Sequence, residues 1–146
     1  MVWLDPQEHE QQAYQELRLH APRTEKVSLE FHPLKMSREP GWNPAWAEWH
    51  CYAAPLRIYR QDYRLLLSYF SRIYPTRDAF DGTPEPVFDV CSHNWIGKEE
   101  WLKFISGIEQ NWAAIPDEQK PFFLAFLKWL KDALRHTAII VVEGNL

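Results

Sequence analysis

The stretch from Gly97 to Val142, GKEEWLKFISGIEQNWAAIPDEQKPFFLAFLKWLKDALRHTAIIVV, decides the fold of this chain. Its apolar residues recur three and four positions apart, which predicts one amphipathic helix over about 98–114 and another over about 117–136. A turn at Pro116 and Asp117 separates them, and because it is short we expect an antiparallel helical hairpin. The face of the second helix expected to be buried carries Phe122, Phe123, Phe126, Leu127, Leu130 and Leu134. The β-branched run AIIVV that follows predicts a buried strand.

Toward the N-terminus, the sequence predicts further helices and one clear strand. The segment VSLEFH at 27–32 alternates apolar and polar residues, which predicts a half-buried strand. Helices are expected over about 5–20, from Asn43 to Pro55, and from Tyr59 to Tyr74. A second short strand is expected at PVFDV, 86–90. We therefore expect an α+β fold that is predominantly helical, with about five helices and a small sheet of two or three strands.

The chain has 146 residues, of which 46% are hydrophobic and 25% are charged, as is typical of a globular protein with one core. We expect a single domain over residues 1–146, with the turn-rich segment 75–86 as a candidate hinge. No uncharged apolar run reaches the roughly 18–20 residues of a membrane span, and the first residues do not follow a signal-peptide pattern. Because there are only two cysteines, Cys51 and Cys91, we expect free thiols and a cytoplasmic location.

The net charge of −4 is spread unevenly along the chain. Residues 81–119 carry eight acidic side chains but only two lysines. The candidate partner-binding residues in this block are Asp81, Glu85, Asp89, Glu99, Glu100 and Glu109. The electrostatic field of such an acidic block steers a basic partner toward the surface. Solvent-exposed helix faces alone would also explain the excess of acidic residues. Upstream lie three arginines, Arg57, Arg60 and Arg64. Nucleic-acid binding usually requires more basic residues than this, so we expect these arginines to form ion pairs with the acidic block instead.

The sequence holds eight tryptophans, an unusually high number for its length. Three of them, Trp42, Trp46 and Trp49, fall on one face of the short helix predicted from Asn43 to Pro55. They could pack against the helix predicted from Tyr59 to Tyr74, because aromatic side chains carry large apolar areas. They could instead anchor a protein interface or stack on a small ligand. These interpretations stay open, and the three tryptophans join the candidate partner-binding residues.

Cysteine and histidine occur together at His50 and Cys51, and again at Cys91 and His93. Adjacent residues point about 100° apart on a helix and to opposite faces of a strand, so this spacing does not favour a shared zinc ion. Cys91 and His93, with Asp89 to orient the imidazole, could form a nucleophilic pair, but buried and inert cysteines are the simpler expectation. The sequence has no glycine-rich phosphate loop or hydrolase motif, so we predict no catalytic residue, no metal and no cofactor.

The chain is compact, acidic and rich in aromatic residues, without an export signal or an active-site motif. In these respects it resembles the small acidic immunity proteins of bacteria, which neutralise a toxin delivered by a neighbouring cell. The resemblance implies a non-catalytic cytoplasmic protein, monomeric or homodimeric when free, that binds a cognate protein toxin, with a basic nuclease domain as one candidate. Neither a membrane nor a nucleic acid is an expected partner. Two alternatives stay open: a small enzyme or ligand-binding domain that uses an aromatic pocket with Cys91 and His93, and a homo-oligomeric adaptor.

Overall fold

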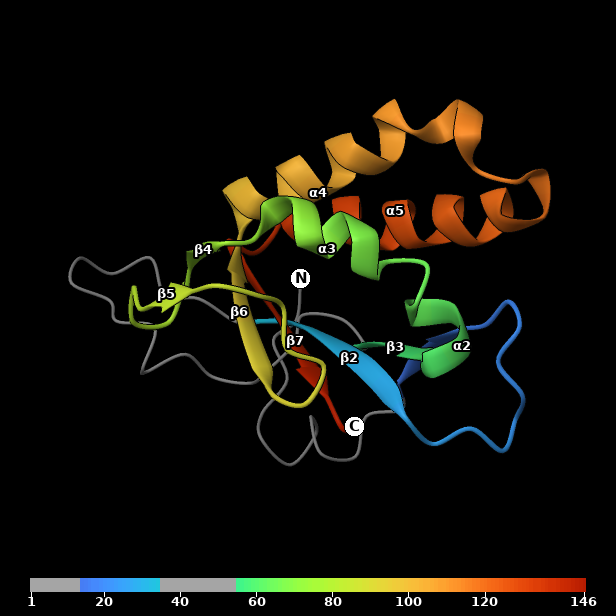
Figure 1. Cartoon of the computed structure of the whole chain (residues 1–146), viewed down its shortest axis with the longest axis horizontal. Coiled ribbons are helices and arrows are strands. Elements are labelled where there is room, and N and C mark those ends of the chain that lie inside the picture. Colours follow the sequence, from blue (N-terminus) through green and yellow to red (C-terminus); the bar gives the residue numbers. More distant parts are fainter. Residues whose placement is uncertain (1–13, 35–54) are drawn as a thin grey trace.

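A five-stranded mixed sheet lies at the centre of the fold (Figure 1). The computed structural model describes residues 14–34 and 55–146 of the chain. The strands are β1 (Gln15–Leu17), β2 (Ser28–Pro33), β3 (Leu56–Tyr59), β6 (His93–Gly97) and β7 (Ile139–Gly144), in the order β1-β3-β2-β7-β6. β1 is parallel to β3, and the other neighbouring strands are antiparallel. A separate ladder pairs β4 (Thr76–Arg77) with β5 (Pro84–Glu85).

Helices cover one face of this sheet (Figure 1). The helices are α2 (Arg60–Tyr63), α3 (Leu67–Ile73), α4 (Lys98–Gln110) and α5 (Lys120–Leu134), and short 3₁₀ turns at Trp112–Ala114 and Asp117–Gln119 connect the last two. α4 and α5 run antiparallel, which confirms the predicted hairpin. The predicted stripe on α5 is confirmed as well, since all of its residues are buried. β7 confirms the strand predicted from AIIVV.

The main core lies between these helices and the sheet. Phe31 of β2 contacts Trp101 of α4 and Phe126 of α5, with ring centroids 6.2 and 5.4 Å apart. One cluster of buried side chains includes residues from both sides of segment 75–86, and the single-domain assignment stays a prediction. Within the described ranges, no helix is long and apolar enough to span a membrane.

The expectation of a predominantly helical fold with a small sheet is wrong. Over residues 14–34 and 55–146 the structure is a mixed α/β fold with 40% helix and 25% strand, and its main sheet has five strands. The strands of the main sheet that the sequence did not predict, β1, β3 and β6, contain only three to five residues, too few for an alternating pattern to be recognised. Each pairs with a strand that is distant in sequence, as β6 does with β7, so its stability does not come from local pattern.

The chain between Tyr59 and Tyr74 is not one helix, as its periodicity predicted. Tyr59 ends β3, α2 follows, and a turn at 64–66 separates α2 from α3. Asp62 lies on the predicted apolar face, but its buried carboxylate accepts hydrogen bonds from the backbone N–H groups of residues 19–21. This contact belongs to a distant segment, which a helical period in the sequence cannot reveal.

Two further segments differ from expectation. Residues 15–17 form β1 instead of the end of the helix predicted over 5–20, most of which lies outside the described residues. PVFDV, 86–90, is not a strand, because the side chain of Asn94 rather than a neighbouring strand holds its backbone. The helix predicted from Asn43 to Pro55 falls almost entirely outside the described residues.

The strand predicted at 27–32 is confirmed as β2, but it is not half-buried. Ser28 and His32, on its polar face, are each only 2% exposed. β2 lies between β3 and β7, and a second group of buried apolar side chains lies on this face of the sheet. Val141, which pairs with His32 in the strand register, belongs to this group. The polar alternation of β2 therefore marks a buried polar network, not a face in water.

Candidate functional site

The β4–β5 ladder and its turn position several acidic residues. In the turn, a carboxylate oxygen of Asp78 accepts a hydrogen bond from the backbone N–H of Phe80 (2.6 Å), and one of Asp81 accepts from Thr83 (2.9 Å). Gly82 supplies the positive φ of 77° that the turn requires. Short acidic side chains are favoured in such turns because they bond to nearby backbone N–H groups. The turn therefore places two carboxylates close together at the end of the ladder.

A buried asparagine holds the segment after β5 against the sheet. The side-chain oxygen of Asn94 accepts a hydrogen bond from the backbone N–H of Asp89 (2.9 Å), and its N–H₂ group donates to the carbonyl oxygen of Asp89 (2.7 Å) and to a carbonyl of β7 (3.0 Å). The backbone N–H of Gly144 also donates to the carbonyl oxygen of Ser92 (3.1 Å). A methyl group at Gly144 would collide with the carbonyl group of Val90, so this approach of loop and strand requires glycine. These contacts fix the position of Asp89.

A small acidic cleft of about 90 Å³ opens between these loops and β6. Its lining includes Tyr74, Asp78, Glu85, Asp89, His93 and Trp95. Burial raises the pKa of the Tyr74 phenol, and the charges of Asp78, Glu85 and Glu100 raise it further, which places these carboxylates around one phenol. Burial also raises the pKa of Asp78, and the charge of Asp81 adds to the effect. No cation from the described part of the chain forms an ion pair with Asp78, Glu85 or Asp89, whereas Glu100 pairs with Lys103 at 3.2 Å.

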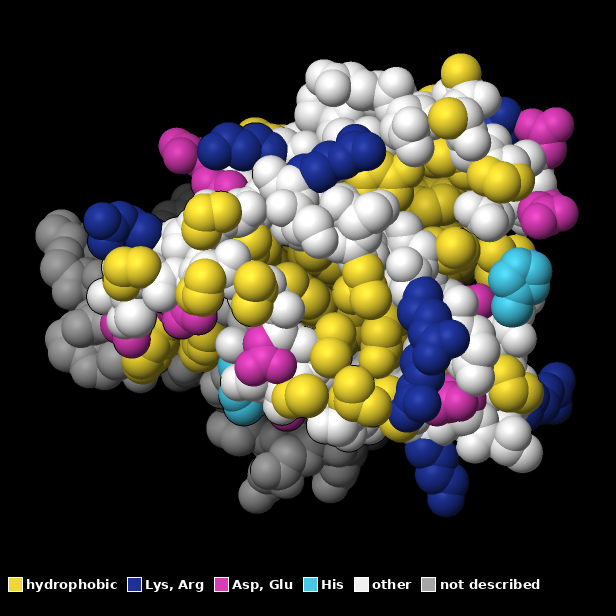
Figure 2. Space-filling model, in the orientation of Figure 1, with side chains coloured by type: hydrophobic (Ala, Val, Ile, Leu, Met, Phe, Trp, Pro, Cys, Tyr) yellow, Lys and Arg dark blue, Asp and Glu magenta, His cyan; other side chains and the backbone are white. Residues whose placement is uncertain are grey.

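A second cleft of about 420 Å³ meets the first at Tyr74 and has mostly apolar walls. It is lined by Leu67, Ser71, Tyr74, Pro86, Val87, Phe88 and Val90. Phe88 stacks on Phe70 with ring centroids 3.9 Å apart, which fixes one wall, whereas Val87 stays exposed. Figure 2 shows hydrophobic side chains across the middle of this face, between α3 and the loop after β5, with acidic side chains along one edge. We call the two clefts together the Tyr74 surface.

The structure brings together most, but not all, of the predicted acidic residues. Those on or beside the Tyr74 surface are Asp81, Glu85, Asp89 and Glu100, and Glu99 is the neighbour of Glu100 in the first turn of α4. Glu109 lies at the other end of α4, where it pairs with Lys131 at 3.5 Å. Trp42, Trp46 and Trp49 lie outside the described residues. Asp78 and Tyr74 were not predicted as site residues, and the only sequence signal for them was their position in and beside the turn-rich segment.

The structure does not assemble Cys91, His93 and Asp89 into a nucleophilic arrangement. A carboxylate oxygen of Asp89 accepts a hydrogen bond from the backbone N–H of Cys91 (2.8 Å), which is a local turn contact. Nε2 of His93 lies 3.2 Å from a carboxylate oxygen of Glu143 instead. The expectation of buried cysteines is wrong for Cys91, which is exposed because it lies in the loop before β6. Cys51 lies outside the described residues.

A polar network on the other face of the sheet was not predicted as a site. Glu30 lies opposite both Arg57 and Glu143 in the strand register, and Nε2 of His32 lies 3.6 Å from a carboxylate oxygen of each glutamate. Glutamates directly opposite one another repel unless cations compensate them. Although burial acts to raise the pKa of Glu30, its contacts with His32 and Tyr14 and the charge of Arg57 lower it. Among the described residues, no group of three or more side chains is arranged to bind a metal ion.

The three arginines predicted as a helical stripe lie on different elements. Arg57 lies in β3 and pairs with Glu30 (3.5 Å), while Arg60 begins α2 and pairs with Glu25 (3.8 Å). The expected pairing of these two arginines with residues 81–119 is therefore wrong, because the sheet places β3 beside β2 and the loop that precedes it.

The Tyr74 surface combines concentrated negative charge with an adjoining apolar cleft. Its parts are held in place by the β4–β5 turn and by Asn94. A polar edge around an apolar centre is the usual composition of a protein-binding surface. We found no protein-family model, no curated protein and no solved structure that matches this chain.

Proposed function

We propose that this chain is a non-catalytic binding protein that neutralises a basic protein partner, as a bacterial immunity protein does with its cognate toxin in the cytoplasm. The observation that carries the proposal is the Tyr74 surface, where carboxylates border an open apolar cleft. The apolar cleft would take apolar or aromatic side chains at the centre of an interface, and the carboxylates would pair with cations at its edge. Covering a basic active site, such as that of a nuclease domain, requires no chemistry from this chain.

The charge of Asp78 supports a binding role, because it does not help the protein to fold. Burial and the charge of Asp81 raise the pKa of Asp78, so the folded protein holds this proton more tightly than the unfolded chain does. Ionised Asp78 therefore opposes folding at neutral pH. Charges that cost stability are typical of functional sites.

Asp78→Asn is expected to raise the melting temperature slightly at neutral pH and to weaken partner binding. Asparagine keeps an oxygen that can accept the hydrogen bond from the N–H of Phe80, while the negative charge is lost. The gain in stability should disappear at about pH 3, where Asp78 is largely protonated in the folded and the unfolded protein. Thermal unfolding of both proteins across this pH range checks the prediction. A lower melting temperature for the variant at neutral pH would contradict it.

The partner is to be identified by affinity purification of the tagged chain from its native host, followed by mass spectrometry and light scattering of the complex. We expect a stoichiometric basic protein that is toxic when it is expressed alone. A monomer that brings down no partner would contradict the proposal. A homodimer without any other protein would favour the adaptor alternative.

Reversing the charge of the Tyr74 surface is expected to slow association with this partner by at least about tenfold at low salt. The variant is Glu85→Lys with Glu99→Lys, because neither side chain bonds to another described side chain. The matched control is Glu109→Lys with Glu118→Lys, which makes the same change in net charge at the opposite end of α4 and in the turn beyond it.

Stopped-flow measurements at several salt concentrations distinguish these two variants. The surface variant should lose most of the salt dependence of its association rate, and the control should retain most of it. Equal slowing of both variants would show that only the total charge matters, and it would exclude the Tyr74 surface as the docking site.

A further inference from the structure

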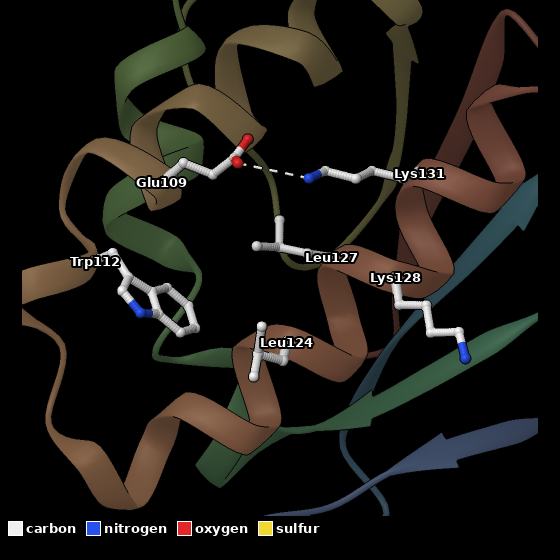
Figure 3. Close-up of a pocket in the computed structure, with 6 residues that line it drawn as sticks. All are labelled: Glu109, Trp112, Leu124, Leu127, Lys128 and Lys131. Carbon is white, nitrogen blue, oxygen red and sulfur yellow. Dashed lines mark ion pairs between the residues drawn. The ribbon is translucent and has the colours of Figure 1, made fainter.

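A third open cavity, a groove, lies between α5 and the end of α4, at the opposite end of α4 from the Tyr74 surface (Figure 3). It has a volume of about 550 Å³ and is lined by Glu109, Trp112, Leu124, Leu127, Lys128 and Lys131. Figure 3 shows Trp112 facing Leu124 and Leu127 across the groove, while Lys131 reaches toward Glu109. Small-molecule sites have volumes of about 300–1,000 Å³, so the groove is large enough for a ligand.

Some of the apolar side chains that line this groove are not buried in the hydrophobic core. α5 buries its core stripe through other positions, and Leu124 remains 57% exposed. Trp112 is only partly buried, whereas Leu127 is buried and forms the base of the groove. A single exposed leucine is ordinary, but here a leucine and a tryptophan line the same cavity. A ligand with an apolar body would remove both side chains from water.

The edge of the groove is cationic. Lys131 pairs with Glu109 at 3.5 Å, and both side chains are about half exposed. Lys128, on the preceding turn of α5, is exposed and forms no ion pair with a described residue. Lys120 lies over the ring of Trp112, 5.9 Å from its centroid, and pairs with Asp117 at 2.8 Å. Three lysines therefore face two carboxylates, which leaves an excess of one positive charge. The groove therefore complements a ligand with an apolar body and an anionic end.

We propose that this groove binds a single-chain amphiphile with a carboxylate head group, namely a free fatty acid. The hydrocarbon chain lies against Trp112, Leu124 and Leu127, and the carboxylate replaces Glu109 as the partner of Lys131. Lys128 points away from Lys131 in Figure 3, so it adds positive charge at the edge of the groove without pairing directly with the same carboxylate. This exchange is feasible because an exposed ion pair contributes little to stability. The site is separate from the proposed function, since it uses neither cleft of the Tyr74 surface.

Isothermal titration calorimetry of the full chain with decanoate, kept below its micelle concentration, tests the proposal. We expect saturable binding of one decanoate per chain. Decyltrimethylammonium, which has the same hydrocarbon chain and the opposite charge, should bind at least about tenfold more weakly. Equal affinities for the two amphiphiles, or no binding of decanoate, would overturn the proposal.

Variants at exposed positions locate the site. Leu124→Glu is expected to abolish decanoate binding, whereas Leu102→Glu, at a leucine of similar exposure (51%) on α4, should leave it unchanged. Lys128→Glu should weaken binding by about threefold or more, with Lys103→Glu on α4 as its control. Circular dichroism verifies that each variant is folded. The same result in both leucine variants, whether loss or retention of binding, would overturn the location.

Glu109→Gln separates a defined head-group site from a groove that merely attracts apolar molecules. The change frees Lys131, so the affinity for decanoate is expected to rise about two- to fivefold, and that for decyltrimethylammonium should fall. The indole N–H signal of Trp112 should shift in NMR spectra when decanoate is added. A lower decanoate affinity in the variant would exclude Lys131 as a head-group ligand, and an unmoved Trp112 signal would exclude the groove.

Discussion

Asp62→Ala is expected to lower the free energy of unfolding by about 3–4 kcal/mol. Asp62 is fully buried, and its two carboxylate oxygens accept hydrogen bonds from the backbone N–H groups of Leu19 (2.8 Å), His20 (2.7 Å) and Ala21 (3.3 Å). Hydrogen bonds to a charged acceptor are stronger than neutral ones, and here one side chain supplies three of them. Alanine would detach this segment from α2 and leave a cavity in its place.

Urea denaturation measures this loss as a lower midpoint with an unchanged slope. Asp62→Asn should lose more than half as much, because its amide presents N–H groups where the backbone already donates. Asp132→Ala, at an exposed position on α5, is the control and should change stability by less than about 0.5 kcal/mol. If Asp62→Ala stays within about 1 kcal/mol of the wild type, the segment 19–21 is held by other contacts.

The parts of the fold that could be predicted from the sequence are those with local causes. α4 and α5 have long apolar stripes, and β7 is a continuous β-branched run, so each of them can be recognised from a short stretch of sequence alone. β1, β3 and β6 are short and depend on partners far along the chain. Asp62 illustrates the difference, because its position fits a helical period while its bonds lie with residues 19–21.

The candidate site could be predicted only in part for a similar reason. The charge run in the sequence located Asp81, Glu85 and Asp89, but it also included Glu109, which the length of α4 carries to the opposite end of the helix. The role of Asn94 in holding Asp89 depends on a loop that folds back onto β6. The spacing of residues in the sequence does not indicate that this loop folds back onto β6.

For β2, the sequence correctly predicted which residues share a face but wrongly predicted that this face is exposed to solvent. Alternation placed Ser28, Glu30 and His32 on one face, as the structure has them, and suggested that water covers this face. In the sheet, β2 has a strand on each side, so polar side chains of β3 and β7 bond to it instead. Burial depends on strand order, and strand order is not encoded in any single segment.

Trp101→Ala is expected to cost about 3–5 kcal/mol of the free energy of unfolding. Trp101 is fully buried, and its ring packs against those of Phe31, Phe70 and Phe104. Its indole N–H also donates to the carbonyl oxygens of Ile96 (3.1 Å) and Ile140 (3.3 Å), which are partners in the register of β6 and β7. Alanine would remove both the apolar packing and the bond that ties α4 to the two strands.

Trp101→Phe separates these contributions, because phenylalanine keeps an aromatic ring and lacks the N–H donor. We expect a loss of about 1–2 kcal/mol, with Trp129→Phe, at a partly buried tryptophan of α5, as the control. Since β6 carries Asn94, which holds Asp89, a loosened β6 should also disturb the acidic cleft. Amide hydrogen exchange should therefore accelerate more in β6 and in residues 89–92 of the folded variant than in β2 or β3, where it rises only with the loss of global stability. Equal acceleration in β6, β2 and β3 would mean that pairing with β7 alone fixes β6, and that the cleft does not depend on Trp101.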